Sequence, residues 1–235
     1  GGGGGGGGCA SFVRALCIPG VVEFALALFF CKLVAYTFIY WLPLYLTHIN
    51  YTTTEAGYLS TFFDLGGILG GVSAGWLSDR MGVRGVVAVG FLLAAVPGLY
   101  FYRVLTKEIG DSSTSLNVLF MLVCGAIVNG PYALITTAVS ADLGTHKSLK
   151  NDAKLLASVT GIIDGTGSIG AACQGVLISY ISSTLSWTAV FYALIACSCC
   201  SALLLTRVVV KEIRGVLRQR ARRARGLSAG SALSA

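Results

Sequence analysis

Three charged side chains interrupt long apolar runs of this sequence, and they are the first candidates for chemistry. Lys32, Asp64 and Asp164 each lie near the middle of a run long enough to cross a bilayer. A charge at the centre of a membrane helix costs about 2.5 to 3.5 kcal/mol on the insertion scale, so such residues usually serve a function. The ammonium group of Lys32 is a good point-charge ligand for phosphate.

Residue spacing extends this candidate site beyond Lys32. Tyr36 follows Lys32 by four residues and therefore shares its helical face. Asn129 opens the segment Asn129-Gly-Pro-Tyr132, in which Pro131 removes a backbone donor and can kink a helix toward a cavity. We therefore expect Lys32, Tyr36, Asn129 and Tyr132 to contact a substrate.

Other roles are open to the same charges. Lys32 could form a structural ion pair with Asp64, or its side chain could extend to the membrane interface. For Asp64 and Asp164 we expect a structural or gating role, because a carboxylate repels an anionic substrate.

A charged loop separates two of the apolar runs. Its sequence is Gly75-Trp-Leu-Ser-Asp79-Arg80-Met-Gly82-Val-Arg84. Gly82 supplies the backbone freedom that a tight reversal needs, and Asp79 can cap or pair with a neighbouring helix end. Arg80 and Arg84 favour the cytosolic side of a membrane. We assign Asp79, Arg80 and Arg84 a gating or structural role; the alternative is an ordinary charged turn.

The elements that must position these residues are membrane helices. Hydrophobic residues make up 55% of the 235-residue chain and charged residues only 11%, with a mean hydropathy of +0.78, whereas soluble domains carry about 25% charged residues. We predict an all-α membrane protein with six transmembrane helices. They cover residues 21–46, 56–77, 86–105, 116–138, 156–181 and 187–210. Glycines four residues apart should mark helix contacts, namely Gly66, Gly67, Gly70, Gly71, Gly75, Gly161 and Gly165, with Gly167, Ala171 and Gly175 extending the pattern.

The distribution of positive charge predicts the orientation. Of the 17 Lys and Arg residues, 14 fall on one side of the predicted helices and 2 on the other, with Lys32 inside the membrane. By the positive-inside rule both ends are cytosolic. The sequon Asn50-Tyr-Thr52 then falls in the first non-cytosolic loop, which makes Asn50 a candidate for glycosylation.

The net charge of +7 does not indicate nucleic-acid binding, because the basic residues flank membrane helices. Attraction to anionic lipid, worth about 1 kcal/mol per charge, explains them better, as does a solvated tail that only sets topology. The eight Cys lie in or beside apolar runs, and His48 and His146 are isolated. We therefore predict no metal site, no cofactor and no catalytic residues, so the chain is not expected to be an enzyme.

The chain divides into three segments. Residues 1–18 form a low-complexity stretch and cytosolic linker, whose opening run Gly1–Gly8 is expected to have no fold. Residues 19–210 form the six-helix membrane part, and residues 211–235 form a basic cytosolic tail. The chain length accommodates six helices but not twelve, so we expect a fragment of a longer protein.

Several segments together resemble a known family. They are 17–24, 40–45, 63–67, 160–170 and, above all, 129–150. These segments are similar to the sugar-phosphate exchangers of the organophosphate:phosphate antiporter family, within the major facilitator superfamily. The loop 75–84 resembles the cytoplasmic signature loop of that superfamily.

This resemblance implies both a fold and a function. The chain would be the C-terminal half, helices seven to twelve, of a twelve-helix transporter whose N-terminal six-helix half is missing. Such a protein would exchange a glucose-6-phosphate-like sugar phosphate for inorganic phosphate by alternating access in the endoplasmic reticulum membrane, with substrate held between the halves. The different-class alternative is a non-transporting membrane sensor or scaffold of the same fold.

One position departs from the family pattern. Related members place a phosphate-binding Arg or Lys six residues before the Trp of the segment 40–45, and this chain has Ala35 there. Lys32 lies about one helical turn earlier and could take over that role.

Overall fold

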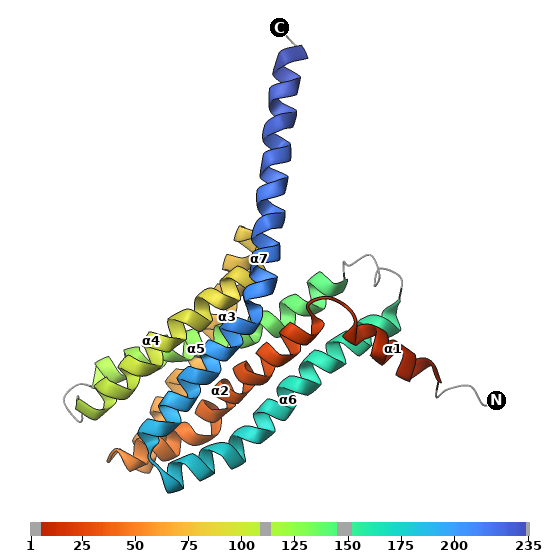
Figure 1. Ribbon diagram of the computed structural model, residues 1–235. Coiled ribbons are helices and arrows are strands. Elements are labelled where there is room, and N and C mark those ends of the chain that lie inside the picture. Colours follow the sequence, from red (N-terminus) through yellow and green to blue (C-terminus); the bar gives the residue numbers. More distant parts are fainter. Residues whose placement is uncertain (1–5, 109–113, 145–151, 234–235) are drawn as a thin grey trace.

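The computed structural model describes residues 6–108, 114–144 and 152–233, which form helices and no strands (Figure 1). The all-α fold class is therefore confirmed. The elements in order are α1 (Gly6–Leu16), α2 (Val21–His48), α3 (Thr53–Met81), α4 (Arg84–Glu108), α5 (Thr114–Gly144), α6 (Ala153–Thr184) and α7 (Trp187–Leu233).

Each predicted membrane segment falls inside one of the helices α2 to α7. In the described part of the chain, five helices are long and apolar enough to cross a membrane: α2, α4, α5, α6 and α7. Helix α3 has 29 residues, a sufficient length, but its glycines, Asp64 and polar side chains reduce its apolar character. It packs mainly along α5 and leaves its other face exposed, and close packing of this kind is typical of glycine-rich membrane helices.

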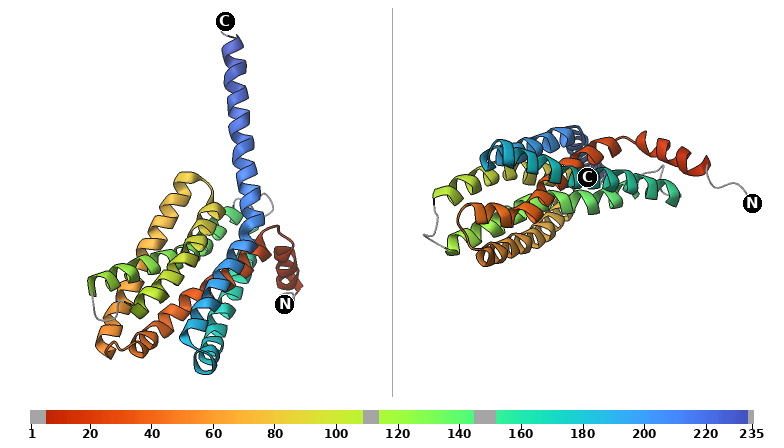
Figure 2. Two further views of the ribbon diagram at one scale, coloured as in Figure 1. Left: turned by 60° about the vertical axis from the view of Figure 1, so that its left-hand side comes forward. Right: turned by 90° about the horizontal axis from the view of Figure 1, so that it is seen from below.

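Helices extend into both terminal segments of the described chain. Helix α1 begins at Gly6, so the glycine run does not lack structure throughout; residues 1–5 lie outside the described part. Helix α7 continues to Leu233, and its last part projects away from the bundle in Figure 1 and in the left-hand view of Figure 2. The many Arg, Ala and Leu residues after position 210 are strong helix formers, which explains the extension.

Both ends of α3 have capping residues of a common type. Thr52 caps α3: its hydroxyl accepts a bond from the Glu55 amide, and the Glu55 carboxylate accepts from the Thr52 amide at 2.9 Å. The Thr52 hydroxyl also donates to the Glu55 carboxylate at 2.7 Å, and this bond, together with the one from the Thr52 amide, lowers the pKa of Glu55. Gly82 ends α3 with a φ of +68°, a left-handed conformation that glycine adopts at little cost. Thus the predicted reversal at Gly82 is confirmed.

Two apolar clusters fill the bundle, one on each side of its middle. The first contains Leu28 and Cys31 of α2, and the second contains Leu33 and Phe38 of the same helix. Lys32 therefore stands at the junction of the two clusters. In the second cluster the ring of Phe38 stacks on that of Phe63, with centroids 4.8 Å apart. Aromatic contacts of this kind tie α2 to α3.

Glycines allow α3 and α5 to touch backbone to backbone. A Cβ atom at Gly66 would overlap the carbonyl group of Leu122, and one at Gly70 would overlap that of Ala126. The prediction that these glycines mark a helix contact is confirmed. Gly75, which continues the sequence pattern, faces open space, so the pattern alone overestimates the contact.

Helix α6 shows the same mixture of contact and exposure. A Cβ atom at Gly170 would overlap the carbonyl group of Phe29 in α2, whereas Gly161, Gly165 and Gly175 face open space. The glycine spacing in α6 therefore correctly predicts a helix contact at Gly167, which is described with the site below. It wrongly predicts contacts at the three exposed positions.

We predict that Gly70→Ala destabilises the protein and that Gly75→Ala does not. The methyl group at position 70 meets backbone atoms that cannot rotate away, so α3 and α5 must separate, at a cost of about 1 to 3 kcal/mol. At position 75 the methyl group meets no neighbour. Thermal unfolding of the two detergent-solubilised variants measures the difference, and equal Tm values would contradict the packing described here.

Candidate functional site

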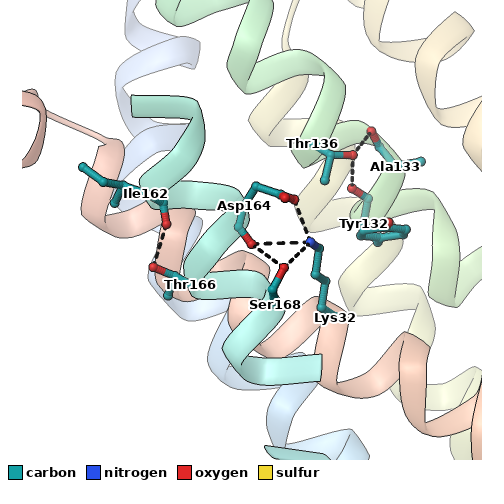
Figure 3. Close-up of polar contacts among 8 residues, drawn as sticks. All are labelled: Lys32, Tyr132, Ala133, Thr136, Ile162, Asp164, Thr166 and Ser168. Carbon is teal, nitrogen blue, oxygen red and sulfur yellow. Dashed lines mark hydrogen bonds and ion pairs between the residues drawn. The ribbon is translucent and has the colours of Figure 1, made fainter. Parts of the chain in front are cut away.

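Lys32 is buried in the middle of α2 and forms an ion pair with α6. Its Nζ atom lies 2.6 Å from Oδ1 of Asp164 and 3.3 Å from the Ser168 hydroxyl oxygen (Figure 3). The Lys32 side chain is only 6% exposed, whereas that of Asp164 is 59% exposed. The pair thus has one buried, positively charged member and one member that remains open to the surroundings.

Lys32 pairs with Asp164 and not with Asp64, the partner that the sequence suggested. Asp64 lies on an exposed face of α3, and the described residues show no ion pair between it and Lys32. The proposed structural pair of Lys32 with Asp64 is therefore wrong. Asp164 takes that place because α6, rather than α3, packs most closely along α2.

Gly167 makes room for the lysine stem. A Cβ atom at position 167 would lie 2.9 Å from Cδ of Lys32 and 2.8 Å from Cγ of Leu28. Both distances are shorter than ordinary van der Waals contact. Gly167 thus lets the Lys32 chain pass α6 at close range and reach Asp164 and Ser168, which lie on the same part of that helix.

Two tyrosines adjoin the ion pair. The Lys32 ammonium lies 5.9 Å from the ring centroid of Tyr132, within the range of a cation–π contact. Tyr132 in turn meets the ring of Tyr36 edge to face, with centroids 6.4 Å apart. Lys32, Tyr36, Tyr132 and Asp164 therefore form one cluster made by α2, α5 and α6.

The observed contacts of Asn129 lie outside this cluster. Its Nδ2 atom donates to the carbonyl oxygen of Gly125 at 3.2 Å, and its side chain packs against Gly67 of α3. The observed contacts of Asn129 thus hold α5 near α3. Helix α5 continues through Pro131, so no chain break marks this site.

The charged loop before α4 is tied together by its own side chains and by α7. Asp79 pairs with Arg84 at 3.6 Å, and the guanidinium of Arg80 lies 5.3 Å from the ring centroid of Trp76. The Glu212 carboxylate of α7 accepts from the Gly85 amide at 2.9 Å.

Glu212 caps the first turn of α4 from another helix. Besides the Gly85 bonds, it accepts from the Val86 amide at 3.3 Å. A carboxylate at a helix N-terminus satisfies free amides and is favoured by the helix dipole. Sequence reasoning missed this residue, although an isolated acid among the basic residues of the tail was a usable signal.

Two further contacts concern other sequence features. The Trp41 indole donates to Oε1 of Gln174 at 2.8 Å and joins α2 to α6. Neither residue was predicted to interact. Asn50 is exposed with a φ of +76° at the end of α2, directly before Tyr51 and the capping residue Thr52. Its glycosylation stays a prediction.

We predict that Glu212→Gln loosens the start of α4. The charged acceptor becomes a neutral one, and the amides of Gly85 and Val86 should exchange with deuterium faster, by roughly fivefold for each kcal/mol lost. Lys211→Gln, which changes the exposed neighbouring residue, is the control. Unchanged exchange at both amides would show that Glu212 does not hold this helix end.

Comparisons with known proteins agree with the helical membrane fold. Residues 24–234 match the family model described as Major Facilitator Superfamily. The chain is 55% identical over 204 residues to Glucose-6-phosphate exchanger SLC37A2 of Bos taurus, covering 86% of this chain and 40% of that protein. It is 54% identical over 208 residues to an Arabidopsis thaliana protein provisionally named glycerol-3-phosphate transporter 1, covering 86% of this chain and 39% of that protein.

These matches confirm the resemblance to sugar-phosphate exchangers. The chain spans about 40% of the length of the curated relatives it matches, and no solved structure matches it. The family model covers most of the sequence, and the fold is a bundle of membrane-length helices. This chain belongs to the Major Facilitator Superfamily.

Proposed function

We propose that this chain forms the C-terminal half of a membrane exchanger of organic phosphate for inorganic phosphate, and that Lys32 binds the phosphate group. The observation that carries the proposal is the pairing of a buried ammonium with an exposed carboxylate. The two relatives above are named for glucose-6-phosphate and glycerol-3-phosphate. Both compounds are phosphate monoesters, so a cation that binds phosphate would serve either one.

The electrostatics of Lys32 support phosphate binding. A phosphate dianion that leaves water for a membrane cavity needs a compensating positive charge. Among the residues whose side chains are described, Lys32 is the cation at the junction of the two apolar clusters. Its Nζ atom contacts Asp164, Ser168 and the Tyr132 ring, and the first of these partners is 59% exposed.

Asp164 and phosphate would compete for the same ammonium. In the empty site the Asp164 carboxylate neutralises Lys32 at 2.6 Å. Because the Asp164 side chain is 59% exposed, it can turn away when a phosphate oxygen approaches Lys32. The buried charge is then neutralised in both the empty and the loaded state, which keeps its desolvation cost low throughout the transport cycle.

Neighbouring polar groups would complete the site. Tyr36 and Tyr132 carry hydroxyl groups that can donate to phosphate or to the hydroxyls of a sugar. We retain Asn129 as a candidate substrate contact, through movement of α5 during the cycle. Asp64, Asp79, Arg80 and Arg84 are proposed to serve gating or structural roles.

Related family members have a phosphate-binding Arg or Lys where this chain has Ala35, which supports a phosphate-binding cation at another position. Ala35 is fully buried in the second apolar cluster, so this position faces the interior of the bundle. A charged side chain there would lack the polar neighbours that Lys32 has. Lys32, one turn earlier, is therefore the better placed phosphate ligand in this chain.

The proposed protein has a second half and a membrane location. Substrate would lie between this bundle and an N-terminal six-helix half, whose docking would cover exposed apolar residues such as Tyr40 and Ile68. The helices support a multi-pass membrane protein, and we propose the endoplasmic reticulum membrane on the basis of the resemblance. No catalytic role is proposed. A sensor or scaffold of this fold would bind phosphate without exchanging it.

We predict that Lys32→Ala in the full-length protein abolishes phosphate-linked exchange while leaving membrane insertion intact. Lys32→Arg should keep part of the activity, since the charge survives but its geometry changes. Exchange of labelled phosphate in proteoliposomes measures both variants. Wild-type phosphate affinity in the Lys32→Ala protein would move the phosphate site elsewhere, and binding without exchange in the wild type would favour the sensor.

A second prediction separates the two carboxylates. Asp164→Asn removes the competitor for Lys32 and should tighten phosphate binding while slowing turnover, because the empty site is no longer neutralised. Asp64→Asn is the matched control, since the described structure shows no pairing of Asp64 with Lys32. Equal phosphate affinities in the Asp164→Asn variant and the wild type would contradict the competition between Asp164 and substrate.

A further inference from the structure

A cavity lies between α4 and α7, on helices that do not contribute to the Lys32 cluster. Its volume is about 250 Å³. The lining includes Arg103 of α4 and the α7 residues Thr188, Phe191 and Tyr192. The cavity therefore combines one cation with aromatic walls, at a place that the proposed exchange does not use.

The cation in this cavity is held in place. Arg103 donates from Nη2 to the Thr188 hydroxyl oxygen at 2.7 Å, and this bond joins α4 to α7. A guanidinium has five N–H donors in a planar fork, a geometry that suits phosphate oxygens. Phe191 and Ile195 supply an apolar wall beside it.

The position of the cavity along the helices corresponds to the membrane interface. Arg103 lies near the end of the apolar segment Arg84–Leu105, and Thr188 is the second residue of the apolar segment Trp187–Arg218. Both segments therefore meet the headgroup region at this end of the bundle. Tyrosines are enriched at that depth, and Tyr100 and Tyr192 are 49% and 58% exposed here.

We propose that this cavity binds a membrane phospholipid, with the lipid phosphate on Arg103 and the first acyl segments against Phe191 and Ile195. The half-exposed tyrosines place the cavity at the outer surface of the bundle, where lipid has access from the side. An apolar wall next to a cation fits a lipid better than a free phosphate ion, which would leave that wall in contact with water. The proposal is independent of the role of Lys32.

The test measures thermal stability of the full-length protein in detergent with three probes. Dioleoyl phosphatidic acid and dioleoylglycerol differ only in the phosphate group, and inorganic phosphate has the charge without the chains. We expect phosphatidic acid to raise Tm in a saturable manner and the other two probes to have no comparable effect. Saturation gives an apparent lipid affinity.

Variants then locate the effect. Arg103→Gln should weaken the apparent affinity for phosphatidic acid by about tenfold, the loss expected for a charge-assisted contact, and Arg103→Lys should be intermediate. Arg207→Gln, which removes an exposed cation in the part of α7 far from this cavity, is the matched control, and Lys32→Ala controls for the other site. If Arg103→Gln fails to fold, Arg103→Lys and Thr188→Val report on the same contact.

Three results would overturn the proposal. An equal response to dioleoylglycerol would show that only the apolar wall binds. An Arg103-dependent response to inorganic phosphate of the same size would indicate a free-ion site. Unchanged lipid affinity in the Arg103 variants, or in Thr188→Val and Arg103→Lys where Arg103→Gln does not fold, would remove the cavity from lipid binding.

Discussion

An ammonium group in the middle of a membrane bundle must be neutralised, and the close packing of α2 against α6 makes this possible. Lys32 is buried, and Asp164 neutralises it at 2.6 Å. Such a short distance between side chains of two helices requires close packing, which Gly167 and Gly170 permit. The same helices are joined further along by Trp41 and Gln174. The ion pair thus depends on the backbone contact, and the backbone contact brings the charge within reach of a carboxylate.

The remaining helices surround this pair without burying its acidic member. Apolar clusters lie on both sides of Lys32 along α2, and the ring of Tyr132 on α5 lies 5.9 Å from the ammonium. At one end of the bundle Glu212 ties α7 to α4 beside the charged loop. A transporter that alternates its access must move helices around a fixed ligand. In the proposed exchange, Lys32 would provide such a ligand, because it is buried in α2 while its partner Asp164 is exposed.

Features that depend on composition and residue spacing could be predicted from the sequence. Contacts that depend on how the helices pack could not. The six predicted segments all fall within helices, five of which are apolar enough in the described chain to cross a membrane, and the reversal at Gly82 follows from backbone freedom. Lys32 could be found because a charge stands out in an apolar run, but the choice between Asp64 and Asp164 depends on which helix packs against α2. For the same reason glycine spacing identified the contact at Gly70 and wrongly included Gly75. Helix α7 continues past the predicted membrane segment 187–210, because charge limits a membrane segment but does not end a helix.

The central claim is that the Lys32 ammonium contacts the phosphate of the substrate, and solid-state NMR tests it most directly. The full-length protein, labelled with ¹⁵N at lysine side chains and reconstituted in lipid that contains no phosphorus, is saturated with inorganic phosphate. The account predicts a ¹⁵N–³¹P dipolar coupling typical of direct hydrogen-bonded contact, lost in the Lys32→Arg protein because its lysine label is absent. Saturated phosphate with no such coupling at Lys32 would contradict the account.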